Sequence, residues 1–286
     1  MATISPALPT LQSSRLRSFV WPREHGGWGL LLVPLATGAG VSRPGAERAI
    51  WILVFAVVAL GLFCLRTPVE ARLAISPLRP QNEMERRLIH HSIYLYASVT
   101  GLALAALLGW ARAYGLLWLG AAAAIAFIGQ AVWKQGGLEK RRDSQWLGAL
   151  ALTSTAAGAY YLGSGRLDRT AAALWVANWL FAANQIHFVQ LRIRSARAGT
   201  AAEKLVYGKP FLLHQAALLL ILSAAWREGW LPGLAILAFA PVLLRGLAWF
   251  VQPARQLAVR RLGATELAYA VLFGIVFIAG YNLSIR

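Results

Sequence analysis

Long apolar runs separated by short polar segments divide this sequence into nine stretches. A bilayer core of roughly 30 Å requires about 20 apolar residues in each helix that crosses it. Windows of that size predict helices over residues 25–42, 49–65, 91–111, 114–133, 145–163, 170–191, 211–226, 230–251 and 262–283. The pattern therefore predicts an all-α polytopic membrane protein with nine transmembrane helices.

The basic residues predict how these helices are oriented. With the N-terminus inside, the cytoplasmic segments hold 20 of the 28 lysines and arginines, and the outer segments hold seven. Arg245 is the remaining one and lies within the eighth predicted span. Cytoplasmic loops of membrane proteins carry this excess of positive charge. We therefore expect a multi-pass protein of the inner (cytoplasmic) membrane, with the N-terminus in the cytoplasm and the C-terminus outside.

The polar segments also predict the domain organisation. Residues 1–24 form a basic cytoplasmic N-terminal segment, and residues 25–286 form a single transmembrane domain. Two connecting segments are long, at about 66–90 and 192–210, and both lie on the predicted cytoplasmic face. Long loops gathered on one face of a scaffold are a common place for binding chemistry.

Composition agrees with a membrane environment. Apolar residues make up 58% of the chain and charged residues 14%, whereas a soluble domain has about 25% charged residues. The net charge of +17 is spread over short clusters instead of one helix face, which predicts membrane lipids as partners and no nucleic acid. Cys64 is the single cysteine, so neither a disulfide framework nor a thiolate metal cluster is expected.

The first candidate for chemistry is the segment WPREHGGWGLLLVPLATG, which opens the first predicted helix. Glu24 and His25 stand next to glycines that would let a ligand approach the backbone closely. We predict Glu24 as a binding residue and His25 as a catalytic residue. The alternative is that Trp21 and Trp28 anchor the helix at the interface while the glycines pack against a neighbour.

The second candidate is the end of the sixth predicted helix, NWLFAANQIHFVQLRIRSARAG. Asn184, His187 and Arg194 share a helix face because their offsets are three and seven. Polar groups in hydrocarbon are costly and usually face a cavity or one another. We predict His187 as a catalytic residue and Asn184, Gln185, Arg192 and Arg194 as binding residues. The alternative is that some of these groups only join helices by hydrogen bonds.

The third candidate begins the first long loop, in FCLRTPVEARL. Arg66 and Arg72 could clamp a phosphate through bidentate hydrogen bonds, with Glu70 between them as a further binding residue. The alternative is that both are ordinary positive-inside arginines. His214 is expected to be a packing residue. Glu266, near the start of the ninth helix, could balance an arginine that the sequence does not identify.

Acidic residues are too scattered to form a metal site. The chain has two aspartates, Asp143 and Asp168, and no cluster of carboxylates. Mg²⁺ bound to a diphosphate usually takes one or two carboxylates in addition to the phosphates. We therefore predict no metal ligand, no cofactor and no Mg²⁺. The sequence also has no P-loop, Rossmann fingerprint, nucleophile elbow or HExxH motif.

Two resemblances add to this reading. Pro22, Arg23, Glu24, His25 and Gly26 resemble the signature that precedes the first span in the YwiC-like family of bacterial membrane proteins. The wider architecture resembles the UbiA prenyltransferase superfamily, which has nine helices, an inside N-terminus and catalytic loops after helices two and six. The run NQIHFVQLRI also resembles the end of helix six in haem O synthases, a UbiA branch, without the proline of that branch.

The UbiA resemblance implies a cytoplasm-facing cavity for an isoprenoid or another phosphate-bearing lipid. However, if Glu70 takes the place of the last acid in the UbiA aspartate-rich motif, Arg66 takes the place of the first. This charge reversal implies a degenerate or metal-independent prenyltransferase, with His25 or His187 as general base, or a lipid binder without catalysis. A small-solute transporter and a membrane assembly protein are the alternatives.

Overall fold

The computed structural model describes residues 15–22, 25–73, 79–135, 141–196, 200–252 and 258–284. Over these ranges it contains helices, turns and short connections, and no β-strand. The elements are α2 (His25–Ser42), α3 (Ala46–Arg72), α4 (Glu83–Gly109), α5 (Gly115–Gln135), α6 (Arg141–Thr153), α7 (Thr155–Ser164), α8 (Arg169–Arg194), α9 (Ala201–Arg227), α10 (Gly233–Ile236), η2 (Leu237–Phe239), α11 (Ala240–Val251) and α12 (Val259–Ser284).

Every predicted span coincides with helical backbone, but two of them are interrupted. The stretch 145–163 is divided between α6 and α7 at Ser154. The stretch 230–251 contains α10, a single 3₁₀ turn and α11, and Pro241 lies in the first turn of α11. Proline lacks the N–H that a regular helix would use at this point, so a local 3₁₀ turn there is expected.

Among the described residues, five helical stretches are long and apolar enough to cross a membrane: α3, α4, α9, residues 233–251 and α12. The apolar parts of α2 and α5 are shorter, and α6 and α7 are each short because of the break between them. The polar residues of α8 reduce its hydropathy. The protein is thus an all-helical integral membrane protein, while the number of nine crossings and their orientation stay predictions.

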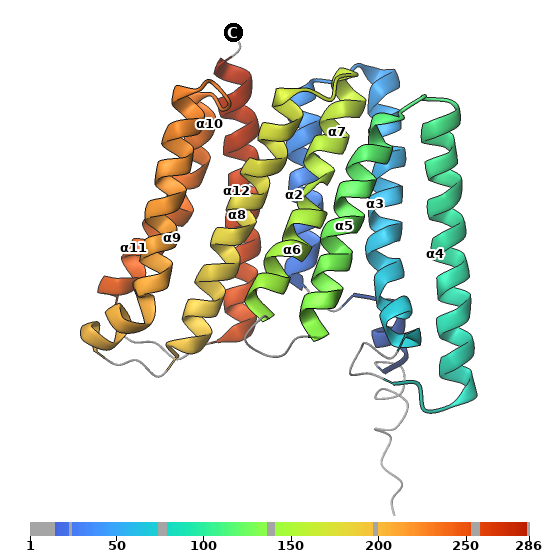
Figure 1. Ribbon diagram of the computed structural model, residues 1–286, viewed down its shortest axis with the longest axis horizontal. Coiled ribbons are helices and arrows are strands. Elements are labelled where there is room, and N and C mark those ends of the chain that lie inside the picture. Colours follow the sequence, from blue (N-terminus) through green and yellow to red (C-terminus); the bar gives the residue numbers. More distant parts are fainter. Residues whose placement is uncertain are drawn as a thin grey trace, which may run out of the picture. The chain divides into compact units, whose positions relative to one another are not determined.

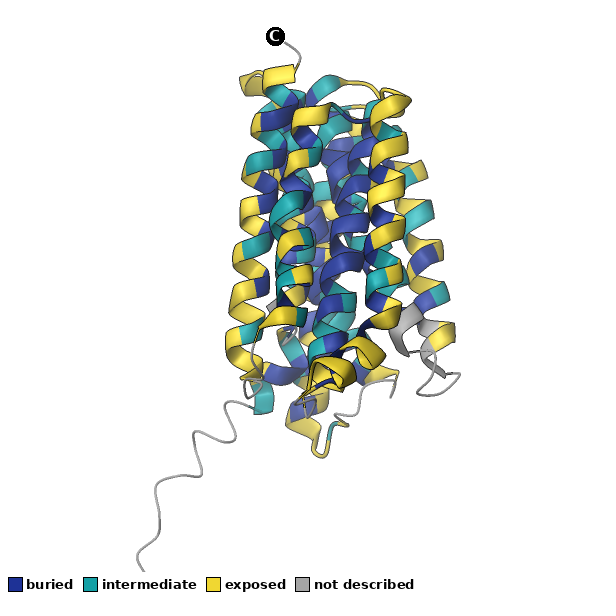
Figure 2. Ribbon diagram, turned by 90° about the vertical axis from the view of Figure 1, so that its left-hand side faces the viewer, coloured by how far each residue is buried: buried dark blue, intermediate teal, exposed yellow. Residues whose placement is uncertain are grey.

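The exposed faces of the long helices are apolar, as contact with lipid requires. Leu102 of α4 is 74% exposed, and Leu220 of α9 and Ile275 of α12 are also strongly exposed. Figure 2 shows buried and exposed residues alternating along the helices, so that a helix has one packed face and one open face. Large apolar side chains on open faces of this kind fit an acyl-chain environment.

The predicted loop boundaries at about 66–90 and 192–210 were wrong, because the helices continue past the apolar runs. α3 reaches Arg72 and α4 begins at Glu83, where the Asn82 side chain accepts a hydrogen bond from the backbone of Glu85. Similarly, α8 reaches Arg194, and α9 begins at Ala201 behind a capping box formed by Thr200 and Glu203. Helix caps end helices by satisfying backbone groups, so hydropathy windows do not locate them.

Packing divides the chain into two compact units, the first formed by residues 1–25 and 50–113 and the second by residues 26–49 and 114–286. In the first unit, a short helical turn over residues 15–20 packs on α3 and α4, where Phe19, Ala71 and Ile89 form a small buried cluster. Arg15 Nε donates to Glu85 Oε1 over 2.7 Å, and this hydrogen bond raises the pKa of the Arg15 guanidinium.

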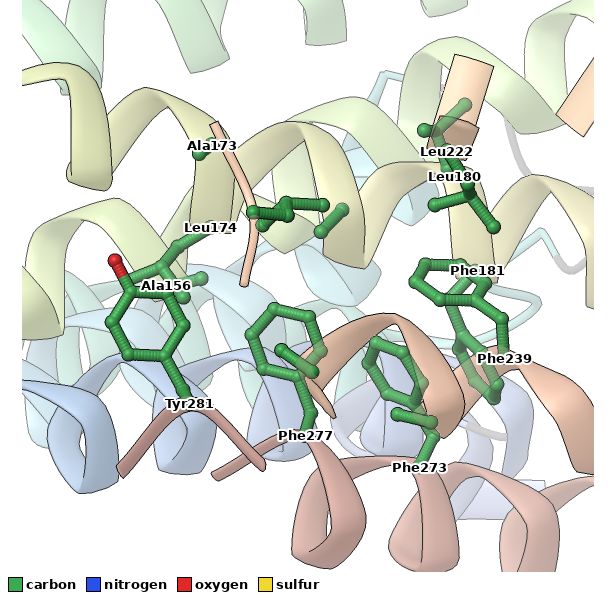
Figure 3. Close-up of a cluster of buried hydrophobic side chains, with 14 of the residues drawn as sticks. Ala156, Ala173, Leu174, Leu180, Phe181, Leu222, Phe239, Phe273, Phe277 and Tyr281 are labelled. Carbon is green, nitrogen blue, oxygen red and sulfur yellow. The ribbon is translucent and has the colours of Figure 1, made fainter. Parts of the chain in front are cut away.

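The second unit contains α2 and α5 to α12, and its helices run alongside one another (Figure 1). Its core is a row of aromatic rings from α8, η2 and α12, in which Phe181 and Phe273 stack with 4.0 Å between ring centroids (Figure 3). Helix α2 is joined to α8 by a buried hydrogen bond, in which Asn178 Nδ2 donates to Thr37 Oγ1 over 3.0 Å. These contacts fix α8 at the centre of the unit.

Candidate functional site

Polar side chains from five helices of the second unit meet near the C-terminal end of α8. We call this group the α8 cluster, and its members are Trp146, Asn184, Gln185, His187, His214, Gln215, Arg245 and Glu266. Arg245 lies six residues before the end of α11, and Glu266 seven residues after the start of α12. At 1.5 Å per residue these positions are about 10 Å inside the helix ends.

One side of the α8 cluster contains three aromatic rings and an amide pair. The ring centroid of His187 lies 4.3 Å from that of His214 and 4.8 Å from that of Trp146. Next to them, Asn184 Nδ2 donates to Gln215 Oε1 over 2.9 Å. These contacts connect α6, α8 and α9, and interhelical hydrogen bonds of this kind stabilise membrane helix bundles by up to about 2 kcal/mol.

The other side contains an ion pair between the last two helices. Arg245 Nη1 donates to Glu266 Oε1, and both side chains are only 11% exposed. The guanidinium carbon of Arg245 lies 4.0 Å from the ring centroid of Phe188 and 4.5 Å from that of Tyr269. Gln185 Nε2 donates to the backbone oxygen of Glu266 over 2.7 Å. The guanidinium is therefore held by one carboxylate and two aromatic rings.

Several buried polar atoms of the α8 cluster have no hydrogen-bond partner. Within the part of the chain that the structure describes, these atoms are Trp146 Nε1, Asn184 Oδ1, Gln215 Nε2, Arg245 Nε, Arg245 Nη2 and Glu266 Oε2. Buried polar groups normally find a partner, and leaving one without costs about 1–3 kcal/mol. Such atoms gathered in one place indicate that water or a ligand completes the site.

Positive charge exceeds negative charge at this position. The half-buried Arg192 interacts electrostatically with both Glu266 and Arg245. Two guanidinium groups thus interact with one carboxylate, Arg245 by direct contact and Arg192 through its charge. Charged side chains inside membrane segments are rare and usually mark a functional position, so this surplus favours a ligand with an anionic or strongly accepting group.

The candidates on α8 lie in or beside this cluster, with one exception. Asn184 and Gln185 are buried, His187 is half-buried, and Arg192 lies next to the ion pair. Arg194 is exposed at the end of the helix. Asn184 and His187 both face α9 through Gln215 and His214, as their predicted shared face requires.

The other predicted residues lie elsewhere in the chain. Arg66 and Glu70 form an ion pair of 2.9 Å within α3, and Arg72 is exposed at the end of that helix. All three belong to the first unit. Glu24 and the side chain of His25 lie outside the described residues. The proposed roles of these residues stay predictions.

Sequence reasoning did not assign a binding role to Arg245, Glu266, His214 or Gln215. For Arg245 a signal existed, because an arginine within an apolar run is costly unless it has a partner. Its partner Glu266 lies 21 positions later on a different helix, and no local spacing connects the two. His214 and Gln215 also acquire neighbours only when α9 packs against α8.

No group of three or more potential metal ligands gathers within the described residues. A surface depression lies at the other end of α8, between the α2–α3 connection and the end of α7, where Arg48 donates to the backbone oxygen of Gly163. Because most of the buried polar atoms without hydrogen-bond partners in the described residues lie in the α8 cluster, the cluster is the stronger candidate site.

Comparison with known proteins gives one match. The profile of the YwiC-like protein family matches residues 21–160, which extend from the end of the N-terminal segment into α7. No curated protein and no solved structure matches significantly, so the UbiA resemblance stays a prediction. The matched region includes the WPREHGGWG segment and Trp146, whereas the other members of the α8 cluster follow it in the chain. On the strength of this match, the N-terminal part of the chain, residues 21–160, is similar to the YwiC-like protein family.

Proposed function

We propose that this protein binds a membrane amphiphile by its polar head, in a cavity at the α8 cluster. The observation that carries the proposal is the set of buried polar atoms without hydrogen-bond partners on α6, α8, α9, α11 and α12. Donors predominate among them, which suits a head rich in acceptor oxygens. The apolar outer faces of α9 and α12 would let the acyl or isoprenoid tail remain in lipid.

The proposal includes the topology that the charge pattern predicts. With nine spans and the N-terminus in the cytoplasm, the C-terminal end of α8 lies on the cytoplasmic side of the inner membrane. The α8 cluster would then open toward the cytoplasmic leaflet, as in the UbiA-like arrangement expected from the sequence. Binding would need no Mg²⁺, because guanidinium groups would take the place of the metal at the anionic head.

A small-solute transporter is the second candidate, and one observation favours it. Two predicted spans are discontinuous, one at Ser154 and one at the 3₁₀ turn Leu237–Phe239. Transporters often place substrate sites at interrupted helices. Uptake of solute into vesicles would support this candidate, whereas retention of one amphiphile per chain supports the first.

Native mass spectrometry of the purified protein, followed by lipid extraction, tests the proposal. We expect one amphiphile for each chain in the wild type. Asn184→Leu should reduce its occupancy by roughly tenfold, because a partnerless acceptor and a donor to Gln215 are both lost.

Asn178→Leu is the matched control. It removes another buried asparagine from the same helix, one that is satisfied by Thr37 and the backbone of Leu174. We expect it to destabilise the protein without loss of the amphiphile. Addition of EDTA should leave occupancy unchanged. An amphiphile lost equally from both asparagine variants, or absent from the wild type, would contradict the proposal.

A further inference from the structure

The guanidinium of Arg245 has two edges, and the structure uses them differently. Nη1 donates to Glu266 Oε1, while Nε and Nη2 have no partner among the described residues. Nε and Nη2 lie on the same side of the planar group, where their N–H bonds are nearly parallel. This is the edge with which arginine binds carboxylates and phosphates through two parallel hydrogen bonds.

The free edge is fixed in position before any ligand arrives. Glu266 holds one end of the guanidinium, and the rings of Phe188 and Tyr269 lie within 4.5 Å of its carbon. An arginine side chain normally loses much rotational freedom when it binds. Here that loss has already occurred on folding, so a ligand that reaches the edge binds a preorganised group.

The charges around this edge indicate how much negative charge the ligand carries. Arg245 and Arg192 contribute two positive charges and Glu266 one negative charge, which leaves a surplus of one among the described groups that interact there. Lys204 is also buried near the end of α11, but its ammonium donates to the backbone oxygens of Trp249 and Gln252. It thus compensates the negative end of that helix.

We infer that Arg245 Nε and Nη2 form a bidentate receptor for one singly charged oxyanion, such as the phosphodiester or carboxylate head of a lipid. This inference rests on the proposed function and names the chemical class of its ligand. A singly charged head neutralises the surplus, whereas a diphosphate carries more negative charge than the site can balance away from water. Glu266 Oε2 remains available to accept a hydrogen bond from a hydroxyl on the same head.

The membrane level of the site favours a lipid over a soluble ion as the source of the oxyanion. Arg245 and Glu266 lie about 10 Å inside the ends of α11 and α12, where a soluble ion would lose much of its hydration. A lipid head reaches that depth while its tail remains among the acyl chains. The chemistry at the guanidinium edge is the same for both sources.

Competition among defined amphiphiles, measured by native mass spectrometry on delipidated protein, tests the inference. The probes are dioleoyl phosphatidylglycerol, neutral dioleoylglycerol with the same chains, and farnesyl diphosphate. We expect phosphatidylglycerol to bind about tenfold or more tightly than dioleoylglycerol, from two charge-assisted hydrogen bonds. We also expect it to bind more tightly than farnesyl diphosphate. Excess inorganic phosphate or acetate that displaces the lipid would support the same receptor with a soluble ligand.

Arg245→Lys is the decisive variant, because it keeps the charge beside Glu266 and removes the two-donor edge. We expect the preference for phosphatidylglycerol to fall by roughly tenfold. Arg261→Lys, an exposed position on α12, is the matched control and should change nothing. If Arg245→Lys does not fold, Arg245→Leu combined with Glu266→Leu removes both charges together and should abolish the preference.

The outcomes separate the inference from the function on which it rests. Equal binding of the charged and neutral lipids, an unchanged preference in Arg245→Lys, or a preference for the diphosphate would each overturn the oxyanion receptor. The proposed function would survive those results. Failure of the wild type to retain any amphiphile would instead overturn the proposed function itself.

Discussion

Two ion pairs of this protein have the same composition and different surroundings. Arg15 and Glu85 pair in the first unit, and Arg245 and Glu266 pair in the second. Both carboxylates are buried, with side chains 4% and 11% exposed. Glu85 uses both of its oxygens, because Oε1 accepts from Arg15 and Oε2 accepts from the backbone N–H of Gln81 over 2.6 Å.

The second pair is incomplete where the first is complete. Within the described part of the chain, Glu266 Oε2 and two nitrogens of Arg245 have no partner. By contrast, about a third of the Arg15 side chain is exposed to solvent. A buried pair by itself therefore does not identify a binding site. A better indication of a binding site is a buried polar atom that has no hydrogen-bond partner in the fold. A pair whose atoms are all hydrogen-bonded has no donor or acceptor left for a ligand.

The largest expected difference between the two pairs is in protein stability, and it is expected on replacement of Arg245 in the second pair. Arg245→Leu leaves a buried carboxylate without a counter-charge, and we expect a loss of about 3–5 kcal/mol in the free energy of unfolding. Arg245→Leu with Glu266→Leu removes both charges and should recover most of that loss. Thermal unfolding in detergent measures both. A double variant as unstable as the single one would show that packing, not charge, holds α11 to α12.

The next effect concerns the first pair and is local. Arg15→Leu removes one of two partners of Glu85 and should release the helical turn over residues 15–20, while α4 keeps its cap at Asn82. We expect a smaller fall in melting temperature than for Arg245→Leu, and faster cleavage of the N-terminal segment in limited proteolysis. Arg17→Leu is the control on the same turn. Equal cleavage rates in the two variants would show that the pair does not hold the turn.

The same contrast explains how much of this fold could be predicted from the sequence. Each predicted span falls on helical backbone, although two are interrupted, because the need for about 20 apolar residues acts locally along the chain. The helix ends were misplaced where caps decide them, as at Asn82 and Thr200. The i,i+4 spacing of Arg66 and Glu70 could have indicated that α3 continues, since such pairs stabilise a helix.

Only those members of the candidate site that lie together on one helix, α8, could be predicted from the sequence. Asn184, Gln185 and His187 could be predicted as candidates because polar residues inside an apolar run are visible in the sequence itself. Arg245 and Glu266 were not paired, because their contact depends on how α11 packs against α12. The family match does not help with them, as it ends at residue 160.

A packing change next to the second pair should have an intermediate effect. A Cβ at Gly246 would overlap the Gln215 amide and lie 2.8 Å from the Phe211 ring. Gly246→Ala should therefore cost about 1–3 kcal/mol by overpacking. Gly101→Ala on α4 is the control, since no atom lies within 4 Å of the Cβ there. Both variants are compared by thermal unfolding, and equal effects would mean that α9 and α11 can adjust at no cost.

The smallest expected effect is at the ion pair that the sequence does display. Arg66 and Glu70 lie one turn apart on α3, so Arg66→Leu should cost about 0.2–0.5 kcal/mol, the usual value for such a pair. Because the α8 cluster supplies the anion receptor in our proposal, Arg66→Leu should also leave amphiphile occupancy unchanged in native mass spectrometry. If amphiphile occupancy falls in Arg66→Leu but not in Arg245→Lys, the anionic head binds at α3 and not at the α8 cluster. That result would support the sequence-based prediction that Arg66 and Arg72 bind a phosphate.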